Sequence, residues 1–190
     1  MAAAEPIRDK NKLRQLAGHC LRRGRLRDHA LIVLGVHTAL RISDLLRLTW
    51  DGVYDERRGA FRSHIDVTEK KTGKRKTIAL NKQAVAALRL LYPSRRGAYI
   101  FANNRRDAAP ISRVQAWRII KAAAEAVGLA GQGVSCHSLR KSMGYHAWKA
   151  GASPVVIMDI YNHSSYEVTR RYLGVAQDDR DKVYLGLAVF

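Results

Sequence analysis

Apolar residues recur at helical spacing through most of the chain. The first such stretch predicts a helix over residues 9–23, with Gly24 as a suitable C-cap. A second stretch begins at the possible cap Asp28 and is apolar nearly all round, so we expect a buried helix in "HALIVLGVH". A third helix is predicted after Ser43. Arg41 is therefore expected at a turn between two helices.

The pattern changes to alternation near the middle of the chain. In "GAFRSHIDVTEK" the alternate positions Phe61, Ser63, Ile65 and Val67 would share one face of a strand. The segment "KRKTIAL" follows directly after the turn pair Thr72-Gly73. This arrangement predicts a β-hairpin whose tip carries lysines and an arginine.

Helical patterns return after residue 81. They occupy "KQAVAALRLLY", "SRVQAWRIIKAAAEAVG" and "HSLRKSMGYHAWKAG", and the last two end in glycine. A short helix is expected from Pro154 to Ile160, and the capping-box pair Ser164 and Glu167 predicts a final helix in "SYEVTRRYL". The sequence predicts a mainly α fold with a small antiparallel β-sheet, in one domain over residues 1–190.

Charge is the unusual feature of the composition. The chain holds 34 Lys and Arg against 16 Asp and Glu, a formal net charge of +18 at pH 7. Such an excess attracts polyanions, of which nucleic acid is the commonest. Charge alone leaves open a basic protein that binds RNA or acidic surfaces without chemistry.

Cysteine use and hydropathy indicate the cellular compartment. Cys20 and Cys136 are too few for a disulfide framework and are not spaced as a metal site. The longest apolar run is about half a membrane span and is broken by His37, and the N-terminus has no signal-peptide core. We expect a soluble cytoplasmic protein with free thiols. The three tryptophans, Trp50, Trp117 and Trp148, fall beside apolar helical positions and are expected in the core.

Six side chains stand out by their order and spacing rather than singly: Arg41, Lys71, His137, Arg140, His163 and Tyr172. They lie in "ALRISDLLRLTW", "KKTGK", "HSLR", "NHSS" and "RRYLG". With these motifs the sequence resembles the tyrosine recombinases, or phage integrase family, from about Ile7 to Val175. The resemblance implies the catalytic-domain fold of that family, those six residues as the catalytic set, and Asp44 as a supporting acid.

The chemistry of the two arginines and the tyrosine fits this resemblance independently. A phosphodiester under attack spreads negative charge over its nonbridging oxygens, and Arg41 and Arg140 could clamp them with paired hydrogen bonds. A tyrosine has an unperturbed pKa near 10 and needs a base or electropositive surroundings to become nucleophilic. His137, one helical turn before Arg140, can accept the proton of Tyr172.

Two further roles complete the expected reaction. By resemblance, His163 donates a hydrogen bond to a nonbridging oxygen. Lys71 at the hairpin tip is expected to protonate the departing 5′-oxygen, although Lys70 and Lys74 are close enough to be alternatives. The arginine clamp removes the need for a metal ion, so we expect no metal, no cofactor and activity in chelator. ATP is not expected either, because the covalent link to the tyrosine keeps the phosphodiester energy.

The predicted function is site-specific cleavage and rejoining of double-stranded DNA. Tyr172 would form a 3′-phosphotyrosine and free a 5′-hydroxyl, and a second 5′-hydroxyl would reverse the step. The resemblance implies a homo-tetramer on DNA, from a protein that is a monomer without DNA. Two alternatives stay open: a type IB topoisomerase-like enzyme, and a catalytically silent DNA-binding regulatory module.

The sequence departs from the family pattern in three places. Only about forty residues precede Arg41, so we expect the separate N-terminal DNA-gripping domain to be absent, either in a short family form or in a chain with an engineered start. The usual Leu-Gly-His is "YNH" here, and Asn162 is expected to adopt the left-handed conformation of glycine. The tail over residues 176–190 is apolar at its end and, by resemblance, is expected to dock on a neighbouring subunit.

One geometric problem remains in the last motif. A straight helix from residue 164 to 172 would separate the backbones of His163 and Tyr172 by roughly 13 Å, at about 1.5 Å per residue. Both side chains can reach one phosphate only if this segment bends or moves. We therefore expect a regulatory segment, in which the hydroxyl points away from the arginines when DNA is absent.

Overall fold

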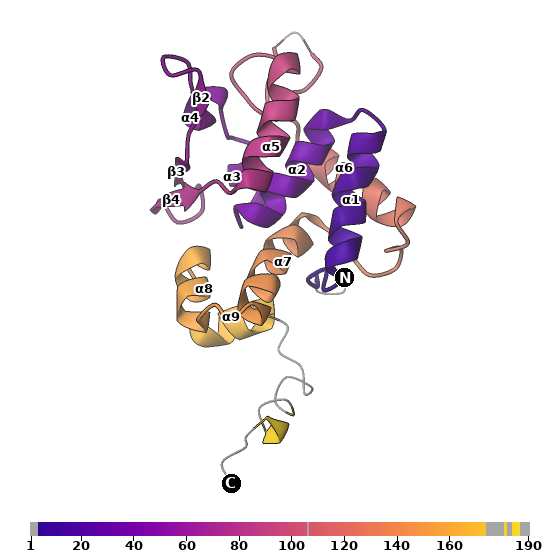
Figure 1. Cartoon of the computed structure of the whole chain (residues 1–190), viewed down its shortest axis with the longest axis vertical. Helices are drawn as coiled ribbons and strands as arrows, with labels where there is room; N and C mark the ends of the chain where they lie inside the picture. The colour runs from indigo at the N-terminus through magenta and orange to yellow at the C-terminus, as the bar shows by residue number, and fades with distance from the viewer. Residues whose placement is uncertain (1–3, 106, 174–180, 182–183, 187–190) are drawn as a thin grey trace.

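The computed structural model describes residues 4–105, 107–173, 181 and 184–186 (Figure 1). Most of these residues are helical, as predicted. The helices are α1 (Lys10–Arg22), α2 (Leu26–His37), α3 (Ile42–Leu45), α4 (Trp50–Val53), α5 (Lys82–Leu91), α6 (Arg113–Ala126), α7 (Cys136–Lys149), α8 (Pro154–Tyr161) and α9 (Tyr166–Leu173), with a 3-10 turn at Tyr92–Ser94.

The strands form two small antiparallel sheets. Strands β1 (Tyr54–Asp55) and β2 (Ala60–Phe61) pair in one sheet, and β3 (His64–Thr68) and β4 (Arg75–Ala79) pair in the other. The predicted hairpin is β3–β4, with Ile65 opposite Ile78. The alternating run in the sequence therefore covers strands of both sheets, because Phe61 pairs with Tyr54 rather than continuing into β3.

The main core surrounds α2, which contacts α1, α5 and α7 (Figure 1). The leucines and isoleucines of this core are almost completely buried, among them Leu31, Leu34, Leu45, Leu88 and Ile120. Burying one such side chain stabilises the fold by about 1.5–3 kcal/mol. The apolar character of α2 on nearly all sides is thus explained by its central place.

A second, smaller core joins α7, α8 and α9. It is built from Ala39, Ile157, Tyr161 and Leu173, all buried. In Figure 1 these three helices form a layer of their own, below the larger helical group. This core fixes α9, and with it Tyr172, against the helix that carries the His-x-x-Arg motif.

Local details differ from prediction in three places. Asp28 is not a helix cap but lies inside α2, 5% exposed, where it forms an ion pair with Arg25 at 2.7 Å. The predicted third helix is two short ones, α3 and α4, separated by residues 46–49. Trp117 is 42% exposed, so its assignment to the core is wrong, whereas Trp50 is buried as expected.

Within the described ranges, no helix is both long and apolar enough to cross a bilayer. The tail over 176–190 falls mostly outside those ranges, so its docking on a neighbour stays a prediction. Of its described residues, Tyr184 and Leu185 are strongly exposed.

Candidate active site

Arg41 lies at the predicted turn between α2 and α3. It is the N-cap residue of α3, and the extended backbone there directs its side chain toward the β3–β4 hairpin. Its Nη1 lies 2.7 Å from Oε2 of Glu69, and the side chain is 21% exposed. Arg41 is therefore held by a carboxylate on one side while its side chain stays partly exposed.

Glu69 was not predicted as a site residue. It directly follows β3 and is completely buried. Its Oε1 lies 2.8 Å from Nζ of Lys76, and its Oε2 accepts hydrogen bonds from Thr72 and Asn162 at 2.8 and 3.0 Å. Burial alone would raise the pKa of Glu69, but these hydrogen bonds and the one from Arg41 hold its pKa at about 2. Glu69 is thus a permanent anion beneath the hairpin.

Asp44, the predicted supporting acid, acts on the hairpin rather than on the guanidinium. It is 2% exposed, and its Oδ1 accepts a hydrogen bond from the backbone N–H of Lys70 at 3.0 Å. The carboxylate that contacts Arg41 is Glu69 instead. The sequence does not show which of these two acids contacts Arg41, because that depends on how the hairpin packs against α3.

Helix α7 presents His137 and Arg140 one turn apart, as predicted. Ser135 caps this helix in a capping box with Ser138. Arg140 is almost fully buried. Its guanidinium donates from Nη1 to the carbonyl of Ala39 and from Nη2 to the carbonyl of Tyr161, the latter at 2.9 Å. Burial and the nearby charge of Arg41 lower its pKa.

The hydroxyl of Tyr161 is inserted into the hydrogen-bond ladder of α7. It accepts from the N–H of Gly144 at 2.7 Å and donates to the carbonyl of Arg140 at 2.6 Å, two groups that would otherwise pair directly. The Tyr161 ring also lies 4.6 Å from the Arg140 guanidinium. The last residue of α8 therefore holds Arg140 through its ring, its carbonyl and its hydroxyl.

Tyr172 on α9 reaches the same place. Its hydroxyl forms a hydrogen bond with Nε2 of His137, and its ring centroid lies 4.5 Å from that of His163. The segment is not one straight helix, since residues 163–165 are non-helical and α9 begins only at Tyr166. We expected the hydroxyl to point away from the arginines, whereas it contacts His137 in the hollow that Arg41 also lines.

Both histidines have a lowered pKa in this environment. Burial, together with the charges of Arg140 and Arg41, lowers the pKa of His137 and of His163 to about 4. His137 is thus neutral at pH 7 and free to accept the proton of Tyr172. His163 contacts Oγ1 of Thr169 through Nδ1 at 3.0 Å, which leaves its Nε2 available for another partner.

A hollow of about 960 Å³ brings these side chains together. Arg41, Lys71, His137, His163 and Tyr172 all line it. Lys71 is exposed at the hairpin tip, and Lys70 lines the same hollow. Of the six predicted residues only Arg140 does not line it, because Arg140 is buried behind His137 and lines a smaller hollow shared with Arg41 and His137.

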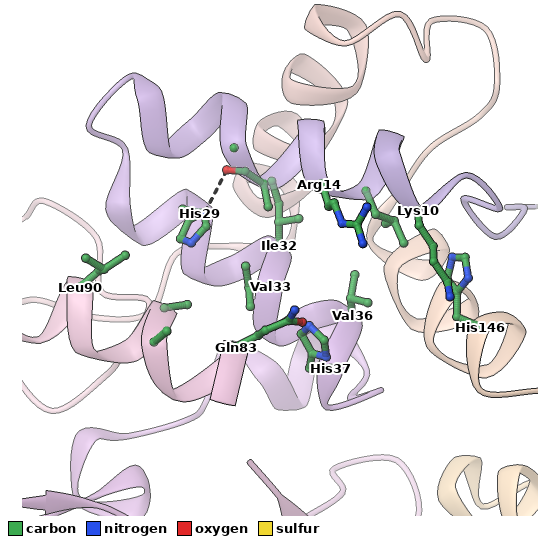
Figure 2. Close-up of a pocket in the computed structure, with 15 residues that line it drawn as sticks. Lys10, Arg14, His29, Ile32, Val33, Val36, His37, Gln83, Leu90 and His146 are labelled. Carbon is green, nitrogen blue, oxygen red and sulfur yellow. Dashed lines mark hydrogen bonds between the residues drawn. The ribbon is translucent and has the colours of Figure 1, made fainter. Parts of the chain in front are cut away.

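A second hollow, of about 550 Å³, lies apart from this site (Figure 2). Its floor is apolar, with Ile32, Val33 and Val36 from α2, and Lys10 and Arg14 stand at its edge. No residue lines both hollows, so it takes no direct part in the chemistry. Among the described residues, no three His, Cys, Asp or Glu side chains are grouped to hold a metal ion.

Solved structures of low sequence identity share this fold. The crystal structure of XerA recombinase superposes with a TM-score of 0.76 at 20% identity, covering 97% of this chain and 66% of that one. The XerH site-specific recombinase, in a post-cleavage complex with its palindromic difH substrate, gives 0.76 at 16% identity, covering 98% and 54%.

Sequence relatives agree. The probable integrase/recombinase YoeC of Bacillus subtilis is 34% identical over 185 residues, 97% of each chain. The tyrosine recombinase XerD of Mycobacterium tuberculosis is 31% identical over 170 residues, so this chain spans about half of that relative, 52% of its length. The family model for the phage integrase family matches residues 8–178. With Arg41, His137, His163 and Tyr172 gathered around one hollow, the chain belongs to the phage integrase family, as its motifs indicated.

Proposed function

We propose that this protein is a site-specific DNA recombinase that cleaves and rejoins DNA through a 3′-phosphotyrosine. The observation that carries the proposal is the hydrogen bond between the Tyr172 hydroxyl and a neutral His137, beside Arg41. Family membership and recombinase relatives favour this function over a topoisomerase-like enzyme or a silent binding module.

Each side chain has a role that follows from its position. His137 removes the proton from Tyr172 as the phenolic oxygen attacks the phosphorus in line. Arg41 and Arg140 stabilise the charge on the nonbridging oxygens; the Nε–H of Arg140 has no partner among the described residues. His163 donates to a nonbridging oxygen.

Lys71 completes the step by protonating the departing 5′-oxygen. Its exposed position at the hairpin tip, on the edge of the hollow, supports this role. Lys76 is a poorer candidate, because its Nζ is already engaged with Glu69 and with the carbonyl of Ile160. The phosphodiester bond energy is kept in the phosphotyrosine link, so rejoining by a 5′-hydroxyl needs neither ATP nor a metal ion.

The test is a suicide substrate: double-stranded DNA from the region flanking the gene, nicked so that a cleaved fragment diffuses away. The protein should form a denaturant-resistant adduct with this DNA, equally in excess chelator, and Tyr172→Phe should form none. No adduct on any flanking fragment would favour the silent module. Strand transfer between two labelled duplexes supports a recombinase, whereas relaxation of one plasmid without transfer supports a topoisomerase.

Assembly is a further part of the proposal. The protein works in the cytoplasm, is a monomer alone and forms a tetramer on DNA, with the tail over residues 176–190 docked on a neighbouring subunit. The exposed Tyr184 and Leu185 support that docking, because apolar side chains in such a tail gain from burial. A chain truncated after Asp181 should assemble and recombine poorly; unchanged assembly and recombination would rule this role out.

A further inference from the structure

We propose that Glu69, assisted by Asn162, is a positioning residue of the cleavage reaction. It orients the guanidinium of Arg41 and joins it to the hairpin tip of Lys71 and to the turn before His163. The inference rests on the proposed function, because it assigns Glu69 a part in the same DNA cleavage.

The contacts of Glu69 connect three separate segments of the chain. Its Oε2 lies within 2.7 Å of Arg41 Nη1, 2.8 Å of Thr72 Oγ1 and 3.0 Å of Asn162 Nδ2. Its backbone closes the hairpin, since Glu69 N–H donates to the carbonyl of Lys74 and its own carbonyl accepts from Gly73. One buried carboxylate therefore fixes the position of α3, the hairpin tip and the α8–α9 turn relative to one another.

Charge explains why an anion is needed there. Arg41, Arg140 and Lys76 lie close enough that the two arginines lower the pKa of Lys76, in addition to its burial. Before DNA arrives, only a fixed negative charge can hold these cations together at short range. The pKa of Glu69 is about 2, so this charge is present at any working pH.

Glu69 does not block the phosphate. A guanidinium has five N–H donors, and the ion pair with Glu69 engages Nη1. Arg41 still lines the large hollow beside Tyr172 and keeps part of its surface exposed. The carboxylate can therefore orient the guanidinium while its remaining donors face the DNA.

Asn162 extends the same arrangement to His163. Its left-handed backbone turns the chain between α8 and α9, and its side-chain amide donates to Glu69. A glycine would adopt this backbone equally well but would lose the amide. The role of the Asn162 side chain can thus be separated from that of its backbone by one substitution.

The experiment measures two quantities on the suicide substrate, the single-turnover rate of adduct formation and the Kd for the same DNA. In Glu69→Gln the rate should fall at least about tenfold while the Kd stays within about twofold or tightens, because a negative charge near the phosphate is removed. Asp66→Asn is the matched control: it removes one carboxylate from the same hairpin, at an exposed position, and should leave the rate unchanged.

A double-mutant cycle tests the assistance of Asn162. Asn162→Gly should slow adduct formation severalfold in the unaltered protein but have almost no further effect in Glu69→Gln. If Glu69→Gln folds poorly, Asn162→Gly alone still tests the inference, since it must slow the rate without weakening the Kd.

The outcomes separate the inference from the function on which it rests. An unaltered rate in Glu69→Gln, or a loss confined to the Kd, would overturn the positioning role while leaving the recombinase intact. Absence of an adduct with the unaltered protein would overturn both.

Discussion

Replacing Gly144 by alanine tests the insertion of the Tyr161 hydroxyl into α7. A Cβ built on Gly144 would stand 2.7 Å from Cε2 and 2.9 Å from Cζ of the Tyr161 ring, and closer still to its hydroxyl oxygen. Tyr161 is fully buried, so its ring has no open space into which to retreat. The alanine therefore displaces the ring together with its hydrogen bonds.

The magnitude follows from four contributions. Overpacking a buried ring costs about 1–3 kcal/mol, and the two hydrogen bonds of the hydroxyl are worth about 1 kcal/mol each. The N–H of residue 144 and the carbonyl of Arg140 can then pair directly, which regains about 1 kcal/mol, and alanine regains about 1 kcal/mol over glycine through helix propensity. The net loss in the free energy of unfolding is thus about 1–3 kcal/mol, by the sum of these terms. The adduct rate should also fall at least about tenfold, since the Tyr161 carbonyl that holds Arg140 moves with the ring.

Urea unfolding followed by circular dichroism measures the change, and Gly18→Ala is the matched control. Gly18 also lies inside a helix, but its Cβ would meet only the flexible end of Arg22, at 3.1 Å. The control should therefore be neutral or more stable by up to about 1 kcal/mol. If Gly144→Ala were as stable as Gly18→Ala, the inserted hydroxyl would not be the arrangement in the protein.

Three further predictions concern the site. Because the pKa of His137 is lowered to about 4, adduct formation should be flat from pH 8 to about 5 and fall below that; half-loss near the ordinary 6.5 would contradict a neutral base. His163 likewise has a folded pKa below its unfolded value, so the contribution of these two histidines to stability is present above pH 6.5 and is lost as the pH falls toward 4, which urea midpoints at pH 7.5 and 5 would show. Lys71→Ala should slow adduct formation by about 100-fold or more. A substrate with a 5′-bridging sulfur should restore the rate, because its thiolate leaves unprotonated. The control Lys70→Ala should slow adduct formation by less than about tenfold.

The sequence predicted those parts of the fold that depend on short-range geometry. The spacing of His137 and Arg140 specifies a shared helix face whatever surrounds it, and Asn162 is one of the few residues that tolerates the left-handed turn where the structure has it. The helical rise per residue alone required that the segment between His163 and Tyr172 bend or move for both side chains to reach one phosphate.

The parts that escaped prediction depend on long-range packing. Glu69 stands among lysines in "TEKK", where a solvated charge is the ordinary interpretation, and only the folding of the hairpin against α3 buries it. The Tyr161 hydroxyl contacts Gly144 on α7, seventeen residues earlier in the sequence, and no helical or strand period predicts a contact at that separation. Asp44 is an acid close to Arg41 in the sequence, as the supporting role requires, but its carboxylate accepts a hydrogen bond from the backbone of Lys70.

The contact between Tyr172 and His137 of its own chain has a genetic consequence. Under the proposed function, a protomer in which Tyr172 attacks from its contact with His137 of the same chain needs no side chain of a neighbouring subunit for the cleavage step. Two defective alleles, one lacking the tyrosine hydroxyl and the other lacking Arg140, would therefore fail to complement each other, because no mixture of their products contains one intact centre. An enzyme that built its centre from two chains would let the same pair of alleles recover activity.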